Sequence, residues 1–269
     1  MKFITNSLKV VSVLFLFLIV ASCDPSNDVL EFNNTRTSQD VQDDFAKIDF
    51  VAGINDLTIE GNFSGINWNF RVIIPESASE LNKLPLVVCL HGGTTRIDPD
   101  LHKHTSCLEE PGFADFDVIL LCPNSDGFIW YDGPQQEKVM TLTELAKNNL
   151  PVDTNKIAIM GYSDGANGAW FYAQHYPTIF SAAIPISSLY NPIRPGLSTA
   201  KIDIPLYVIH GEEDQLFLLS IAQRYIDETV AAGTDLEFII APELEHYNAC
   251  AYVPYLKDAA NWLENTVWN

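Results

Sequence analysis

A serine flanked by glycines is the feature of this chain that points most directly to chemistry. Gly161-Tyr162-Ser163-Asp164-Gly165 follows the apolar run 157–160 and precedes 166–174, which has the pattern of a helix. A sharp turn from strand to helix would expose the Ser163 hydroxyl, and glycines on either side would let neighbouring backbone approach closely. The stretch therefore predicts a nucleophile, but glycine and serine are common residues and the pattern needs support from elsewhere in the chain.

An acid and a histidine that could serve this serine lie further along the chain. A buried-type strand and turn end at Asp214, and a second strand, 236–241, is followed by Glu245-His246-Tyr247. A neutral histidine can accept the proton of a serine hydroxyl, while a carboxylate holds the ring in the useful tautomer. We therefore predict Ser163 as nucleophile, His246 as base and Asp214 as the orienting acid. The competing acids and histidines are Glu212, Glu213, His91, His102, His104, His175 and His210.

A second glycine-containing turn lies upstream of the serine. The apolar run 84–90 leads into His91-Gly92-Gly93, as a strand leads into a loop that can present backbone N–H groups. Such groups stabilise the negative oxygen that forms when a serine attacks a carbonyl. We predict that the N–H groups of Gly93 and Asp164 form an oxyanion hole. The segment 94–112 that follows is the largest irregular insertion and is a candidate wall of the pocket.

From about Leu57 to its end, the chain resembles single-domain α/β-hydrolases of the secreted esterase group. This group includes feruloyl and acetylxylan esterases, polyhydroxybutyrate depolymerases and prolyl-oligopeptidase-like enzymes. The similarity is carried by the stretches 152–163, 176–186 and His210-Gly-Glu-Glu-Asp214, and the order serine, acid, histidine is that of the α/β-hydrolase triad. The resemblance implies ester hydrolysis through an acyl-enzyme without a metal or organic cofactor. Asp164 and Ala166 depart from the Met, Ala or Gln and the Gly common there, so substrate preference does not carry over.

The pattern of elements agrees with one α/β domain. The chain has 269 residues, of which 47% are hydrophobic, which is enough for a substantial core. Alternating signals predict a mainly parallel twisted sheet of about eight strands flanked by helices. The expected strands are 57–60, 68–74, 86–90, 118–122, 156–160, 182–187, 206–209 and 236–240, and the expected helices are 136–149, 163–174, 218–232 and 252–264.

The amino terminus has the features of a bacterial lipoprotein signal. Two lysines precede the apolar run 10–20, which has the length of a signal-peptide core and is short for a membrane span. The stretch Val20-Ala21-Ser22-Cys23 resembles a lipobox, so we expect residues 1–22 to be removed and Cys23 to be acylated. Residues 23–45 are then expected to be a flexible tether, and 46–269 the catalytic domain, anchored in the cell envelope and facing the periplasm or the exterior. The alternative is an ordinary secretory signal with an incidental cysteine.

The net charge and the cysteines restrict which ligands and which disulfides the chain can have. A formal net charge of −20 disfavours nucleic acid as a ligand, because binding it needs a cationic surface. After Cys23, the four cysteines Cys89, Cys107, Cys122 and Cys250 permit three pairings, and the sequence does not choose between them. A bridge from Cys107 to Cys250 would fasten the insertion beside the active site.

The sequence says least about the substrate. Trp130, Tyr131 and Tyr247 occur in loops near the expected catalytic edge, where aromatic rings suit a phenolic acyl group or a sugar. We therefore favour carbohydrate-linked or phenolic esters. A metal site built on His102 and His104 is not expected, because no further ligands have suitable spacing. A serine peptidase of related fold and a non-catalytic surface-binding lipoprotein on a hydrolase scaffold remain as alternatives.

Overall fold

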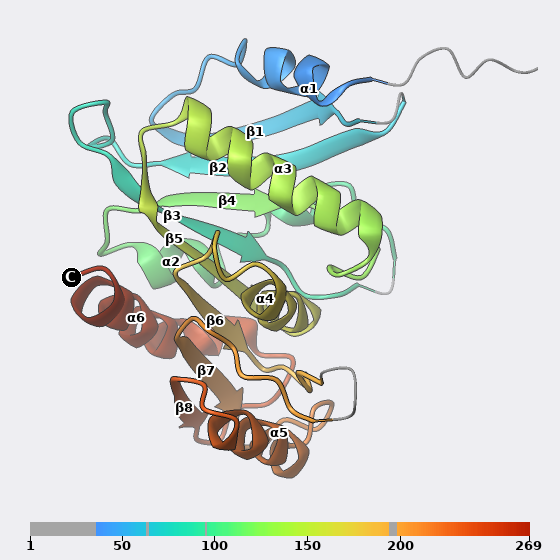
Figure 1. Ribbon diagram of the computed structural model, residues 1–269, viewed down its shortest axis with the longest axis vertical. Helices are drawn as coiled ribbons and strands as arrows, with labels where there is room; N and C mark the ends of the chain where they lie inside the picture. The colour runs from blue at the N-terminus through green and yellow to red at the C-terminus, as the bar shows by residue number, and fades with distance from the viewer. Residues whose placement is uncertain (1–35, 63–64, 95, 194–197) are drawn as a thin grey trace, which may run out of the picture. The chain divides into compact units, whose positions relative to one another are not determined.

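One mixed sheet of eight strands organises the chain (Figure 1). The computed structural model describes residues 36–62, 65–94, 96–193 and 198–269. The strand order is β1-β2-β4-β3-β5-β6-β7-β8, with β1 and β2 antiparallel to their neighbours and the other pairs parallel. The strands are β1 (Gly53–Glu60), β2 (Asn67–Ile74), β3 (Leu84–Leu90), β4 (Ile119–Pro123), β5 (Val152–Tyr162), β6 (Ala182–Ile186), β7 (Leu206–Gly211) and β8 (Leu236–Ala241).

Helices cover both faces of this sheet because the parallel strands are apolar on both sides. In β3, Leu86, Val88 and Leu90 pack into the core shared with α1, α3, α4 and α5, while Val87 and Cys89 face the core shared with α2 and α6. The helices are α1 (Ser38–Phe45), α2 (Glu109–Phe113), α3 (Gly133–Asn149), α4 (Asp164–His175), α5 (Leu219–Ala231) and α6 (Val253–Trp262), with the short helices η1 (Leu101–Lys103), η2 (Ala249–Tyr252) and η3 (Leu263–Val267). The expected sheet and the four expected long helices are confirmed.

The expected tether is wrong for its last residues, because 38–45 form helix α1. Val41 and Phe45 are fully buried in the core, and the Phe45 ring stacks on Phe70 with 6.0 Å between ring centroids. A capping box joins Thr37 and Asp40 at the start of the helix. The polar composition masked an apolar pair spaced four residues apart, which is one helical turn.

The expected signal peptide, the acylated Cys23 and the rest of the tether up to residue 35 lie outside the described residues. Within the described ranges, no helix combines the length and the apolar character that a membrane span requires.

The insertion that follows β3 is fastened at two points. Arg71 of β2 donates to both carboxylate oxygens of Asp56, and its third nitrogen donates to Thr105 and to the Lys103 carbonyl. A disulfide joins Cys107 to Cys250, with 4.9 Å between the Cα atoms. This confirms the hypothesised bridge from Cys107 to Cys250, while Cys89 and Cys122 are buried free thiols.

Candidate active site

The turn between β5 and α4 holds Ser163 in a strained backbone conformation. Its φ is 56° and its ψ is −117°, in a region that residues other than glycine rarely occupy. A Cβ added to Gly161 would lie 2.1 Å from the Gly165 oxygen, and one added to Gly165 would lie 1.9 Å from the Leu90 oxygen. Both glycines are therefore required by close backbone packing, which fixes the turn and projects the serine from the carboxyl edge of the sheet.

The structure brings the three residues expected to act together into one chain of hydrogen bonds. Ser163 Oγ lies 2.8 Å from His246 Nε2, and His246 Nδ1 lies 2.7 Å from Asp214 Oδ2. Asp214 is 2% exposed, and its other carboxylate oxygen accepts the backbone N–H groups of Leu216 and Phe217. An ionised Asp214 makes Nδ1 the protonated nitrogen of His246, which leaves the Nε2 lone pair for the serine proton.

The rival acids and histidines are arranged differently. Glu212 and Glu213 are exposed, whereas the fully buried His210 faces the Phe217 carbonyl at 2.7 Å through Nε2. Burial is the main reason that the pKa of His210 is lowered. Burial likewise lowers the pKa of His91 to about 4, and its Nε2 accepts the Ser125 N–H at 3.0 Å. Both histidines are therefore neutral packing groups near neutral pH.

No cluster of three or more potential metal ligands occurs in the part of the chain that the structure describes.

The two residues expected to form the oxyanion hole lie next to each other beside the nucleophile. A Cβ added to Gly92 would lie 3.4 Å from the Ser163 Cβ, and one added to Gly93 would lie 3.4 Å from the Asp164 Cβ. The loop after β3 is thus packed against the turn. Asp164 is the first residue of α4, where backbone N–H groups point out of the helix and carry partial positive charge. This arrangement can stabilise an anionic oxygen beside Ser163.

Of the three aromatic residues expected to contact substrate, Trp130 is excluded by its burial. Its side chain is 0% exposed, its indole N–H donates to the His91 carbonyl at 2.9 Å, and its ring packs edge-on against His91. Trp130 therefore supports the loop that carries Gly93. An aromatic residue in a loop has the same sequence pattern whether it anchors that loop or faces solvent, which is why this prediction was wrong.

Tyr131 and Tyr247 are accessible. Tyr131 is 37% exposed and its ring packs against Phe171, while Tyr247 is 82% exposed and lies edge-on to His246 with 5.2 Å between centroids. Sequence reasoning gave no role to Tyr162, whose ring stacks on His246 with 5.8 Å between centroids. Its place directly before Ser163 was the available signal, because the residue preceding a turn serine lies at the base of the site.

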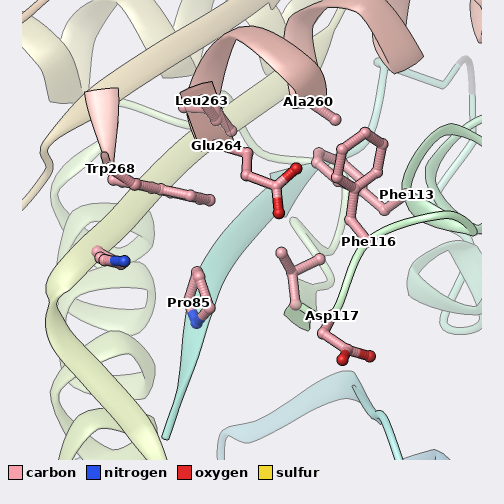
Figure 2. Close-up of a pocket in the computed structure, with 10 residues that line it drawn as sticks. Pro85, Phe113, Phe116, Asp117, Ala260, Leu263, Glu264 and Trp268 are labelled. Carbon is pink, nitrogen blue, oxygen red and sulfur yellow. The ribbon is translucent and has the colours of Figure 1, made fainter. Parts of the chain in front are cut away.

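A cavity of about 170 Å³ lies away from this edge, near the amino ends of β3 and β4. Figure 2 shows the Glu264 carboxylate pointing into it between Trp268 and Phe113. Neither Ser163 nor His246 lines the cavity, so we do not assign it to the chemistry of the triad.

Comparison with known proteins agrees with this geometry. Residues 135–268, about half of the chain, match the model of the dienelactone hydrolase family. A putative carboxymethylenebutenolidase of Methylorubrum extorquens is 27% identical over 115 residues, which span 40% of each chain. The chain therefore covers less than half of that relative's length.

Solved structures share the fold at low identity. The fluorophosphonate-binding serine hydrolase FphF of Staphylococcus aureus superposes with a TM-score of 0.66 at 17% identity, over 79% of this chain and 98% of that one. A ferulic acid esterase superposes with a TM-score of 0.61 at 20% identity, over 80% and 98%. The protein thus has the α/β-hydrolase fold, and Ser163, His246 and Asp214 are joined by hydrogen bonds at the carboxyl edge of its sheet.

Proposed function

We propose that this chain, whose residues 135–268 match the dienelactone hydrolase family, is an extracytoplasmic serine carboxylic ester hydrolase that works through an acyl-enzyme. The observation that carries the proposal is the unbroken hydrogen-bond chain from Ser163 through His246 to Asp214. A serine that merely caps a helix needs neither the strained turn nor a buried histidine paired with a carboxylate.

Each residue has a defined step in the proposed reaction. His246 Nε2 accepts the Ser163 proton as Oγ attacks the ester carbonyl, and Asp214 stabilises the imidazolium that forms. The N–H groups of Gly93 and Asp164 then donate to the tetrahedral oxyanion, each worth about 3 kcal/mol. His246 protonates the departing alcohol, and a water activated by the same ring hydrolyses the ester bond between Ser163 and the acyl group.

Carbohydrate-linked or phenolic esters are the substrates we propose. Tyr131 and Tyr247 offer exposed aromatic faces near the nucleophile, and such faces stack on sugar rings and phenolic groups. The fold shared with a ferulic acid esterase supports the same substrate class. Replacing Tyr247 by Ala is expected to raise KM several-fold for feruloyl esters, because about 1 kcal/mol of aromatic stacking is lost. The kcat for acetyl esters should stay nearly unchanged.

We also propose that the enzyme is held at the bacterial cell envelope by lipid on Cys23. The Cys107–Cys250 bridge supports an oxidising compartment such as the periplasm or the exterior, because disulfides seldom persist in the cytosol. Intact mass of the protein purified from membranes tests this location. A lipidated Cys23 at the amino terminus is expected, whereas a mature protein without lipid would contradict the anchor.

A turnover panel tests the proposed activity. The full chain, purified in detergent, is assayed on p-nitrophenyl, feruloyl and acetylated-sugar esters beside Ser163→Ala and His246→Ala. Ester hydrolysis that falls by about 10⁴-fold or more in both variants is the expected result. Cleavage of peptide amides without ester preference would favour a serine peptidase, and binding without turnover that persists in Ser163→Ala would indicate a non-catalytic role.

A further inference from the structure

The carboxylate of Asp164 stands beside the nucleophile without a hydrogen-bond or ion-pair partner among the described residues. Asp164 directly follows Ser163, and the structure shows no hydrogen bond or ion pair to its side chain from any described residue. Burial, and then the charge of Asp132, raise its pKa. The oxygens of this partly buried acid can therefore accept a hydrogen bond from a donor that a ligand brings.

The position of Asp164 on α4 places it on the helix face that the segment of Trp130 and Tyr131 covers. Asp164, Gly168 and Phe171 share one face of the helix, and the segment of Trp130 and Tyr131 runs along that face. A Cβ added to Gly168 would lie 2.7 Å from the Trp130 Cβ, and the Tyr131 ring packs on Phe171 with 5.6 Å between centroids. Tyr131 thereby lies on the same side of α4 as Asp164.

The other side of Asp164 is bounded by the loop after β3. A Cβ on Gly93 would lie 3.4 Å from the Asp164 Cβ, so that loop packs against the acid, which stays partly exposed. Burial, followed by the Asp164 and Asp132 charges, raises the pKa of Tyr131, which therefore keeps its proton and can donate a hydrogen bond. Asp164 directly follows Ser163, and its charge acts on the Tyr131 phenol, so both groups lie close to the nucleophile.

We propose that Asp164 is a specificity-determining residue that favours esters bearing free hydroxyl groups, such as partly acylated sugars, and disfavours esters bearing a carboxylate near the scissile carbonyl. The inference rests on the proposed ester hydrolysis. Hydroxyl groups donate to the Asp164 carboxylate, and Tyr131 donates to the same polyol. A substrate carboxylate would meet the like charge of Asp164 at a partly desolvated site, where repulsion is weakly screened.

Paired substrates and Asp164→Asn test the proposal in the full chain. The first pair is p-nitrophenyl butyrate and mono-p-nitrophenyl succinate, which differ in a methyl group against a carboxylate. The second pair is a monoacetylated methyl glucoside and its O-methylated counterpart, which differ in free hydroxyl groups. For the wild type we expect kcat/KM to be about 100-fold lower for the succinate than for the butyrate. We expect kcat/KM to be about tenfold higher for the glucoside with free hydroxyl groups than for its O-methylated counterpart. Asn keeps the backbone N–H and the size but removes the charge, so both ratios of kcat/KM should shrink at least fivefold.

A matched control variant distinguishes the effect of a charge at position 164 from the effect of the protein's net charge. Asp235→Asn makes the same charge change at an exposed position just before β8, at the opposite end of that strand from His246. For this control, the kcat/KM ratios within both substrate pairs are expected to equal those of the wild type. An equal loss on all substrates in Asp164→Asn, or a ratio that changes equally in Asp235→Asn, would overturn the specificity role while leaving the proposed hydrolysis intact. Absence of turnover by the wild type on every ester would overturn the proposed function itself.

Discussion

The Cys107–Cys250 bridge gives the sharpest quantitative expectation for stability. The two cysteines are 143 residues apart, so the bridge closes a very long loop in the unfolded chain. The chain-entropy treatment of such a loop predicts a stabilisation of about 5 kcal/mol at 25 °C. Replacing both cysteines by serine should lower the free energy of unfolding by this amount at most, because the unfolded chain keeps some structure.

Urea unfolding of the oxidised wild type and of the Cys107→Ser, Cys250→Ser double variant measures the difference. A reducing agent should lower the urea midpoint of the wild type and leave that of the double variant unchanged. The bridge ends four residues after His246, so we also expect a lower kcat in the double variant at urea concentrations well below its midpoint. Stabilities within about 1 kcal/mol of each other, or reactive thiols at Cys107 and Cys250 in the unfolded, unreduced wild type, would refute the reasoning.

Three further changes test particular contacts. Gly165→Ala places a Cβ 1.9 Å from a backbone oxygen, so it should lower the free energy of unfolding by about 3 kcal/mol or more and remove most of the activity. Gly133→Ala places its Cβ in open space and should leave stability unchanged or raise it slightly, and thermal unfolding of both variants measures the difference. Burial raises the pKa of Glu109 to about 7, so the fold favours its protonated form, and the stability that this group contributes is lost as the pH rises from 4.5 to 7. In urea titrations, the free energy of unfolding of Glu109→Gln should therefore gain up to about 3 kcal/mol over that of the wild type across this pH range. A difference between the two proteins that stays constant with pH would contradict this reasoning. Trp130→Phe loses the hydrogen bond from the indole N–H to the His91 carbonyl and should lower the free energy of unfolding by about 1–2 kcal/mol. The order of preference among ester substrates should stay the same, and a changed order would indicate that Trp130 contacts the substrate.

Much of the fold and of the triad follows from local sequence signals. Each parallel strand is an apolar run, because both of its faces are buried, and such runs are readable without an alignment. The glycines around Ser163 and the order Ser163, Asp214, His246 were enough to place the three side chains at one edge of the sheet. Parallel strands carry their carboxyl ends to the same edge, so residues distant in sequence meet there.

The remaining features depend on three-dimensional packing. Helix α1 has a polar composition, and its stability comes from Val41 and Phe45 meeting the sheet. The burial of Trp130 depends on the space left by Gly168, which the sequence shows only as one more glycine. That the Asp164 carboxylate has no partner within the described ranges is likewise a property of its neighbours in space, so the most specific inference about substrate needed the structure.

Covalent labelling of the nucleophile tests the central claim most directly. The full chain is incubated with a fluorophosphonate probe and its peptides are analysed by mass spectrometry, beside Ser163→Ala and His246→Ala. The account predicts a single adduct on Ser163, abolished in Ser163→Ala and strongly slowed in His246→Ala, because the hydroxyl is activated by the ring that lies 2.8 Å away. A folded wild type that forms no adduct, or one labelled equally well in Ser163→Ala, would contradict the assignment of this site.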